Sequence, residues 1–224
     1  MSPFGTMAAP GGGLIATIDL GSEGMTRVSL APLAALAAAA ILLAGCVTAA
    51  VGAGATVGVA AAEERGVGGA ATDTKIRATI NALWMDRDIE MWRKLGLNVM
   101  EGRVLLTGKV DKTEQHEEAV RLAWRAESVQ EVIDEIKVTS AGDIGNYARD
   151  VQISTELKSK LLLDKHVLSI NYAVTTVDQV IYLLGIAQDL EERERVNNYA
   201  RALPYVKKVV NHVILKDDQR RKPS

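Results

Sequence analysis

The chain has 224 residues, a formal net charge of −2 at pH 7 and a single cysteine, Cys46. Lysines and arginines are interspersed with acidic residues, which predicts a solvated surface rather than a nucleic-acid partner, and one cysteine excludes an internal disulfide. Hydrophobic residues make up 48% of the chain, but much of that share is alanine before residue 72, so the core must come from residues 73–216.

From Met25 the sequence has the layout of a secretory signal peptide. Arg27 supplies a short positive region, and roughly fifteen apolar residues follow before a cluster of small residues. That run is shorter than the roughly 20 residues that a transmembrane helix needs. The preceding residues include Asp19 and Glu23 and do not look like a signal, so a translation start at Met25 is the more economical interpretation. We therefore expect residues 1–45 to be a signal-peptide region.

The end of the apolar run, Leu43-Ala44-Gly45-Cys46, resembles the bacterial lipobox. The resemblance implies that a diacylglyceryl group is attached to the Cys46 thiol and that cleavage makes Cys46 the first residue of the mature protein. The alternative is a plain signal peptide with an incidental cysteine. Val47 follows the cysteine, where an aspartate is the usual signal for retention in the inner membrane, so the resemblance implies an outer-membrane anchor facing the periplasm. Residues 46–72 are rich in glycine and alanine, which predicts a flexible tether.

The rest of the chain contains an internal repeat. A shift of 77 residues aligns the two halves without a gap, and apolar character is kept at many aligned pairs. Two modules of residues 73–140 and 150–217 follow, with a linker of residues 141–149 between them and a basic tail of residues 218–224 after them. Aligned pairs include Asp73 with Asp150, Ile76 with Ile153, Trp84 with Leu161, Gly108 with Gly185, and Glu114 with Glu191.

The periodicity within each module predicts the order αββαβ. A helical stripe with a spacing of four residues opens each module, and two strand-like runs separated by Glu101-Gly102 or Asp178-Gln179 form a hairpin. A second helix follows, with Asp111 or Asp189 expected as its N-cap, and a β-branched strand ends the module. We therefore expect an α+β fold in which two helices cover one face of each three-stranded sheet. The buried side of the second helices should carry Ala119, Ala123 and Ala126 in one module and Val196, Ala200 and Leu203 in the other.

The glycine that closes the second strand, the acidic helix after it and the ending "VQEVIDEIKV" or "VKKVVNHVIL" resemble BON domains. With the lipobox and the tether, the chain resembles the dual-BON outer-membrane lipoproteins of Gram-negative bacteria. The family implies exposure to the periplasm, binding to phospholipid surfaces and a role in envelope integrity. One departure is the stretch "IEMWRKLG" in the first module, which indicates that the two modules have diverged in role.

The sequence contains no recognisable catalytic constellation. His116, His166 and His212 have no metal-ligand spacing, and we expect each to lie on the surface or to take part in packing. Gly108 and Gly185 are interpreted as structural glycines that need a positive φ at a strand end. We expect no enzyme activity, no cofactor, no metal and no small-molecule substrate.

The first helix of the second module carries a candidate lipid face. At about 100° per residue, Val151, Lys158, Leu162 and Lys165 project together, away from the stripe of Ile153, Leu157 and Leu161. Two cations with two apolar residues are typical of a surface that docks on anionic lipid headgroups. A solvated helix face with stray leucines is the alternative. The matching residues of the first module, Thr74, Asn81, Met85 and Asp88, include no cation.

Two binding functions compete. The first is an anchored protein whose partner is an anionic phospholipid surface, and the second is an adaptor for an envelope protein complex or a peptidoglycan-linked partner. The adaptor interpretation is favoured by Val180, Tyr182 and Leu184, which alternate with Ile181 and Leu183, so that both faces of that strand are apolar. The face that the helices leave uncovered must meet a partner or the other module.

Overall fold

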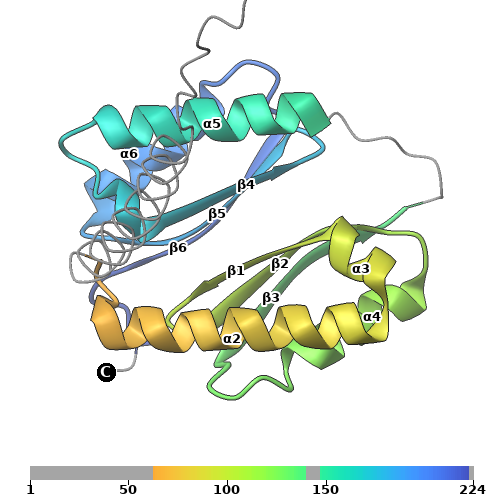
Figure 1. The fold of residues 1–224 in the computed structure, drawn as a ribbon. Helices are drawn as coiled ribbons and strands as arrows, with labels where there is room; N and C mark the ends of the chain where they lie inside the picture. The colour runs from red at the N-terminus through yellow and green to blue at the C-terminus, as the bar shows by residue number, and fades with distance from the viewer. Residues whose placement is uncertain (1–62, 140–146, 222–224) are drawn as a thin grey trace, which may run out of the picture. The chain divides into compact units, whose positions relative to one another are not determined.

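The computed structural model describes residues 63–139 and 147–221, all within one unit of the chain. They form two α+β modules in tandem, as expected (Figure 1). The first contains α2 (Gly66–Arg87), α3 (Ile89–Lys94), β1 (Leu95–Met100), β2 (Arg103–Val110), α4 (Thr113–Ala123) and β3 (Glu131–Val138). The second contains α5 (Tyr147–Leu163), the short 3-10 helix η1 (Ser169–Asn171), β4 (Tyr172–Val177), β5 (Val180–Ala187), α6 (Leu190–Arg201) and β6 (Lys208–Leu215).

Each module is a three-stranded sheet with both long helices on one face (Figure 1). The first two strands pair antiparallel as a hairpin, and the third strand pairs parallel with the second after the helical crossover. The stretch "IEMWRKLG", in which the first module departs from the repeat, contains α3, and the Asp88 carboxylate caps the first turn of that helix. At the matching point of the repeat the second module has only the three-residue 3-10 helix η1, so the helix before the hairpin is longer in the first module.

The long helices begin earlier than the sequence pattern indicated. α2 starts at Gly66, inside the expected tether, and α5 starts at Tyr147, inside the expected linker. Ala70 and Ala71 are strong helix formers, and together with the packing of the downstream turns they outweigh the cost of the glycines in the first turn.

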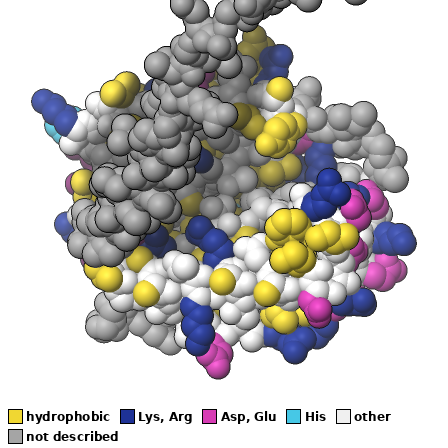
Figure 2. Space-filling view, in the orientation of Figure 1, with side chains coloured by type: hydrophobic (Ala, Val, Ile, Leu, Met, Phe, Trp, Pro, Cys, Tyr) yellow, Lys and Arg dark blue, Asp and Glu magenta, His cyan; other side chains and the backbone are white. Residues whose placement is uncertain are grey.

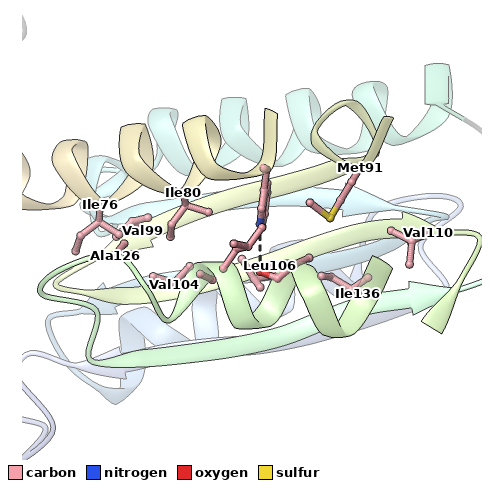
Figure 3. Packing of buried hydrophobic residues seen from close by; sticks show 13 residues of the cluster. Ile76, Ile80, Met91, Val99, Val104, Leu106, Val110, Ala126 and Ile136 are labelled. Atoms are coloured by element: carbon pink, nitrogen blue, oxygen red, sulfur yellow. Dashed lines mark hydrogen bonds between the residues drawn. The ribbon is translucent and has the colours of Figure 1, made fainter. Parts of the chain in front are cut away.

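The core of the first module lies between its helices and its sheet. Ile76 and Ile80 project from α2 toward Val104 and Leu106 on β2 (Figure 3). Trp84 of α2 belongs to the same cluster, and all five side chains are buried. The indole nitrogen of Trp84 donates a hydrogen bond to the Ala119 carbonyl oxygen at 3.1 Å, so the largest core side chain leaves no buried polar atom unpaired. In the second module Ile153, Leu157 and Leu161 occupy the matching stripe. The expected buried positions of each second helix are confirmed for Ala119, Ala123, Val196 and Ala200, while Ala126 and Leu203 are buried but lie in the turns after α4 and α6 end.

A buried aspartate in the first helix of each module holds the hairpin turn. Asp73 accepts hydrogen bonds from the backbone N–H groups of Glu101 and Gly102, both at 2.9 Å. Asp150 accepts the matching pair from Asp178 and Gln179, both at 2.7 Å. All four turn residues have a positive φ, as expected for a tight two-residue hairpin. The same carboxylate therefore ties helix to hairpin in both modules.

The expected N-caps differ between the modules. Asp189 caps α6 by accepting from the Glu192 N–H at 2.8 Å. In a capping box the Glu192 carboxylate would accept a hydrogen bond from the Asp189 N–H. Here it accepts instead from the backbone N–H groups of Leu168 and Gln188, at 2.7 and 2.6 Å. In α4 the expected cap is wrong: Lys112 precedes the helix without a side-chain cap, because Asp111 forms an ion pair with Lys94 at 2.6 Å.

The two structural glycines have different reasons. Gly108 has a φ of 120°, as expected, and a Cβ there would lie 2.3 Å from the Lys94 carbonyl oxygen. Gly185 does not have a positive φ, so that part of the expectation is wrong. A Cβ at Gly185 would lie 2.7 Å from the Asn171 carbonyl oxygen, so this position needs glycine because the neighbouring strand approaches closely.

The sheet faces that the helices leave uncovered pack on each other. Met100 and Leu105 of the first module form one buried cluster with Tyr182, Leu184 and Ile214 of the second. Residues at matching positions of the repeat meet across this interface: Asn98 donates to the Thr175 hydroxyl at 2.8 Å, and the His212 ring nitrogen lies 2.9 Å from the Glu135 carboxylate. Both pairs are separated by 77 residues, the offset of the repeat. The interface is therefore pseudo-twofold, like that of an isologous dimer.

Candidate functional site

The outer flank of α5, defined by Val151, Lys158 and Leu162, is open to solvent. Val151 is 46% exposed and Leu162 is 72% exposed, and Lys158 between them is also exposed. The opposite stripe of α5 is buried in the core, which fixes the rotation of the helix and turns this flank outward. The geometry therefore keeps a lysine and two large apolar side chains together on one exposed surface.

Lys165 does not share the helical angle that the sequence pattern gave it. α5 ends at Leu163, and Lys165 is exposed in the turn that follows. Asp164 organises this turn by accepting a hydrogen bond from the backbone N–H of His166 at 2.9 Å and another from the Tyr199 hydroxyl at 2.9 Å. These two donors lower the pKa of Asp164, chiefly through the His166 N–H. Lys165 thus belongs to the end of α5 and not to its outer flank.

Sequence reasoning missed the other exposed side chains at this end. Leu163 is 84% exposed and Leu168 is 44% exposed, on either side of the turn. Arg195 of α6 lies beside the same turn, with its Nη1 atom 3.8 Å from the Asp164 carboxylate. The leucine run 161–163 is the signal that was available, because only one of three consecutive residues in a helix can face the core.

The matching surface of the first module is used for local structure. Asn81 accepts a hydrogen bond from the indole of Trp92 at 3.1 Å, and Asp88 caps α3 and accepts from Gln115 at 2.9 Å. Met85 is 48% exposed next to Ile89, which is 47% exposed. Figure 2 shows hydrophobic side chains gathered where α2 meets α3, with charges of both signs around them. This surface is apolar but not basic.

The histidines lie in three different settings. His116 pairs with Asp134 on the surface of the first module at 2.5 Å, and His212 pairs with Glu135 across the interface between modules. His166 is exposed in the turn after α5. Within residues 63–139 and 147–221, no three His, Cys, Asp or Glu side chains converge on a point that could hold a metal ion.

The predicted anchor lies outside the described residues. Cys46 and the lipobox residues Leu43, Ala44 and Gly45 all precede residue 63, so their prediction is carried by the sequence alone. A search of the described helices finds none with the length and apolar composition that a membrane span requires.

Several curated proteins are similar to this chain, and three of them show the range of the similarity. An uncharacterized protein in the gshII 5' region of Anaplasma centrale is 35% identical over 59% of this chain and 88% of its own length. Osmotically-inducible protein Y of Escherichia coli is 33% identical over 65% of this chain and 73% of its own. The outer membrane lipoprotein DolP of Haemophilus influenzae is 30% identical over 83% of this chain and 96% of its own.

The family comparison agrees with the duplicated fold. The model of the BON domain matches residues 72–140 and again residues 149–217. Each match covers one αββαβ module, from the aspartate-bearing helix to the last strand. This chain is therefore a member of the BON-domain family with two BON domains in tandem.

Proposed function

We propose that this chain is a lipid-anchored envelope protein that docks on anionic phospholipid surfaces through the outer flank of α5 together with Lys165 in the turn that follows it, and that it supports outer-membrane integrity. The observation that carries the proposal is the exposure of Leu162 and Val151 beside Lys158 on a helix whose other side is buried. A membrane interface would remove these two large apolar side chains from water, while the lysine beside them would meet the anionic headgroups. The proposed activity is binding, without catalysis.

Support for the anchor comes from sequence and from one relative. The alignment with the Haemophilus lipoprotein covers 83% of this chain and so reaches into the segment before residue 63. The only cysteine of the chain lies in that segment, at the end of the apolar run. If Cys46 carries the lipid, Cys46→Ala will release the protein from washed membranes or leave it uncleaved, and the mass of the mature species will change. An unchanged mass and fractionation pattern would contradict the anchor.

The docking surface has the strength of an orienting contact. Each lysine near an anionic membrane contributes on the order of 1 kcal/mol, so Lys158 and Lys165 together supply about 2 kcal/mol, or roughly a thirtyfold change in affinity. That is too weak to hold a free domain firmly. It is sufficient to orient a domain that an acyl anchor already keeps at the membrane.

Vesicle sedimentation of residues 63–224 tests the docking surface. Binding to vesicles that contain phosphatidylglycerol should weaken steeply as salt is raised, and Lys158→Glu with Lys165→Glu should abolish it at low salt. Lys207→Glu with Lys208→Glu is the matched control, because these exposed lysines, where the last strand begins, give the same change in net charge. Equal binding by wild type and the first variant, with circular dichroism unchanged, would sink the proposal.

The role in envelope integrity has its own test. Cells that lack this protein should become sensitive to detergents that an intact outer membrane excludes. The wild-type gene should restore resistance, while the gene with the two glutamate substitutions should not. Full restoration by that variant would separate the cellular role from lipid docking.

The adaptor alternative loses its original support. It was favoured by the apolar sheet faces, and those faces are buried against each other between the modules. One exposed apolar surface for a protein partner is that of Met85 and Ile89, where α2 meets α3. Substituting both residues with serine should leave vesicle binding intact and would remove a protein contact if this surface makes one, as crosslinking in whole envelopes would show.

A further inference from the structure

The hairpin turn of each module carries an acid at the interface between the modules. In the second module it is Asp178, which pairs with Lys109 of β2 at 2.9 Å. In the first module the matching acid is Glu101, and the residue that matches Lys109 is Ile186. Ile186 is buried in the interface cluster and offers no charge to a carboxylate. The repeat therefore lacks a cation for Glu101 at the position where it provides one for Asp178.

The chain supplies that cation from the segment after its last strand. Arg221 donates to both carboxylate oxygens of Glu101, from Nε at 2.9 Å and from Nη2 at 2.8 Å. These are the two parallel bonds with which a guanidinium fits a carboxylate. The Nη1 atom of Arg221 donates to the Lys216 carbonyl oxygen at 2.6 Å, which holds the arginine on the second module. The side chains of the pair are only 16% and 18% exposed, so salt screens it less than a surface pair.

The segment before α2 crosses the interface in the opposite direction. Glu64 precedes the first helix of the first module but binds the second module. Its N–H donates to the side-chain oxygen of Asn171 at 3.0 Å, and its carboxylate accepts from the side-chain amide of Gln188 at 2.6 Å. The next residue, Arg65, returns to the first module, where it pairs with Asp73 at 2.7 Å. Two neighbouring residues are therefore fixed to different modules.

The two crossing segments also bind each other. The Nη2 atom of Arg221 donates to the Glu64 carbonyl oxygen at 3.3 Å, and its Nη1 atom lies 3.7 Å from the Glu64 carboxylate. These residues are 157 positions apart in the chain. We call Glu64, Arg65 and Arg221 the clasp, because together they join both modules at one end of the interface.

The interface that the clasp spans is separate from the two module cores. Each module has its own buried cluster, and a third cluster, which includes Met100, Leu105, Tyr182 and Leu184, lies between the sheets. Because the three clusters share no residue, the interface can open as a unit of its own while each module stays folded. The contacts of Glu64 and Arg221 with the opposite module exist only when the modules are closed.

We propose that the clasp keeps the two modules closed, and that release of Glu64 and Arg221 opens the interface between the sheets while both module cores stay folded. This inference goes beyond the proposed function and does not depend on lipid docking. The chain before residue 63 enters the clasp at Glu64, so a pull on that chain acts first on the contacts with Asn171 and Gln188. The faces that open are apolar, so the open form would bind hydrophobic surfaces that the closed form excludes.

Hydroxyl-radical footprinting read by mass spectrometry tests the clasp on the full chain in nanodiscs of phosphatidylcholine. These contain no anionic lipid, so the proposed docking does not contribute. Met100 and Tyr182 report on the interface, where they are 6% and 1% exposed, and Met91, which is 1% exposed, reports on the core of the first module. Glu64→Ala with Arg221→Ala should raise the modification rates of Met100 and Tyr182 by about tenfold, because bonds to charged groups are lost. The rate of Met91 should not change.

Arg220→Ala is the matched control for Arg221→Ala. It removes the same charge from the neighbouring residue, whose side chain pairs with Asp218 in its own turn at 2.8 Å. Its modification rates should equal those of the wild type. Arg221→Ala alone should give a smaller rise than the double variant, because Glu64 keeps its bonds to the second module.

Three results would overturn the proposal, each for a different reason. A rise at Met100 without one at Tyr182 would mean local exposure beside Glu101, with the interface still closed. An equal rise at Met91 would mean that the module unfolds as a whole. Unchanged rates in the double variant, or the same rise in Arg220→Ala, would show that the clasp does not hold the modules together.

Discussion

The two modules share a framework and differ in what they expose. Each has the aspartate that holds the hairpin turn, the glycine beneath the first strand and the same sheet order. The first uses the end of its long helix to seat α3 and Trp92, while the second leaves leucines and lysines exposed at the matching end. The repeated positions therefore specify the fold, and the positions that differ between the modules are available for function.

The largest expected effect is at the core pair Trp84 and Leu161, which match in the repeat. Trp84→Ala should lower the free energy of unfolding by about 3–5 kcal/mol, because it removes the largest buried side chain and its hydrogen bond to Ala119. Leu161→Ala should cost about 2–5 kcal/mol. Urea unfolding of both variants measures the difference, and a smaller loss for Trp84 would show that the modules are not packed alike.

The next effect concerns the glycine pair. Gly108→Ala should cost roughly 2–4 kcal/mol, because its φ of 120° is unfavourable for alanine and the new Cβ would meet the Lys94 carbonyl oxygen. Gly185→Ala should cost less, because its φ suits any residue and only the close approach of Asn171 opposes a Cβ. Thermal unfolding would rank the two, and a reversed order would contradict the different reasons given for them.

Substituting the aspartates that hold the hairpin turns should cause smaller losses of stability, and the two losses should differ. Asp150→Asn should cost about 1–3 kcal/mol, because an amide group cannot accept both backbone N–H bonds as a carboxylate does. Asp73→Asn should cost more, since Asp73 also pairs with Arg65 at 2.7 Å and the substitution leaves that cation with Glu63 as its remaining carboxylate partner among the described residues. Equal losses in denaturant titrations would show that Arg65 contributes nothing.

The smallest effect belongs to the hairpin-turn acids. Lys109 lowers the pKa of Asp178 by a 2.9 Å ion pair across the interface between modules. A carboxylate with a lowered pKa stabilises the fold above its ordinary pKa of about 4, and that contribution is lost as the pH falls through the folded value. Asp178→Asn should therefore cost up to about 1 kcal/mol at pH 7 and progressively less as the pH falls below the ordinary pKa of an aspartate. A loss that does not shrink as the pH falls would exclude the charge as its cause.

The sequence predicted the fold because its evidence is periodic. Helical stripes, hairpin turns and β-branched endings recur at one offset, and each half supports the interpretation of the other. The repeat aligned Asp73 with Asp150 correctly. Near a helix N-terminus an acid usually complements the helix dipole, so the sequence alone does not reveal that these two carboxylates bind a distant hairpin turn. The N-cap at Asp111 failed because Lys94, far away in sequence, attracts that carboxylate.

The candidate site was predicted only in part, because it is built across elements. Periodicity within one helix found Lys158 and Leu162, which belong to the same flank. It could not find Arg195, which comes from another helix, or see that the helix ends before Lys165. Which helix lies beside which is set by packing against the sheet, and that information is distributed over the whole core.

Matching positions of the two modules contact each other, and this has different consequences for a dimer of identical modules and for two modules joined in one chain. In a dimer of identical modules, Glu135 would face a second glutamate and His212 a second histidine, because each position on a twofold axis meets its own copy. Two like charges at hydrogen-bond distance repel, so such a dimer would have to leave these positions uncharged. Joining the modules in one chain lets each axial position hold an acid on one side and a base on the other. The interface then accepts only unlike halves, and a module paired with a copy of itself would lack that contact.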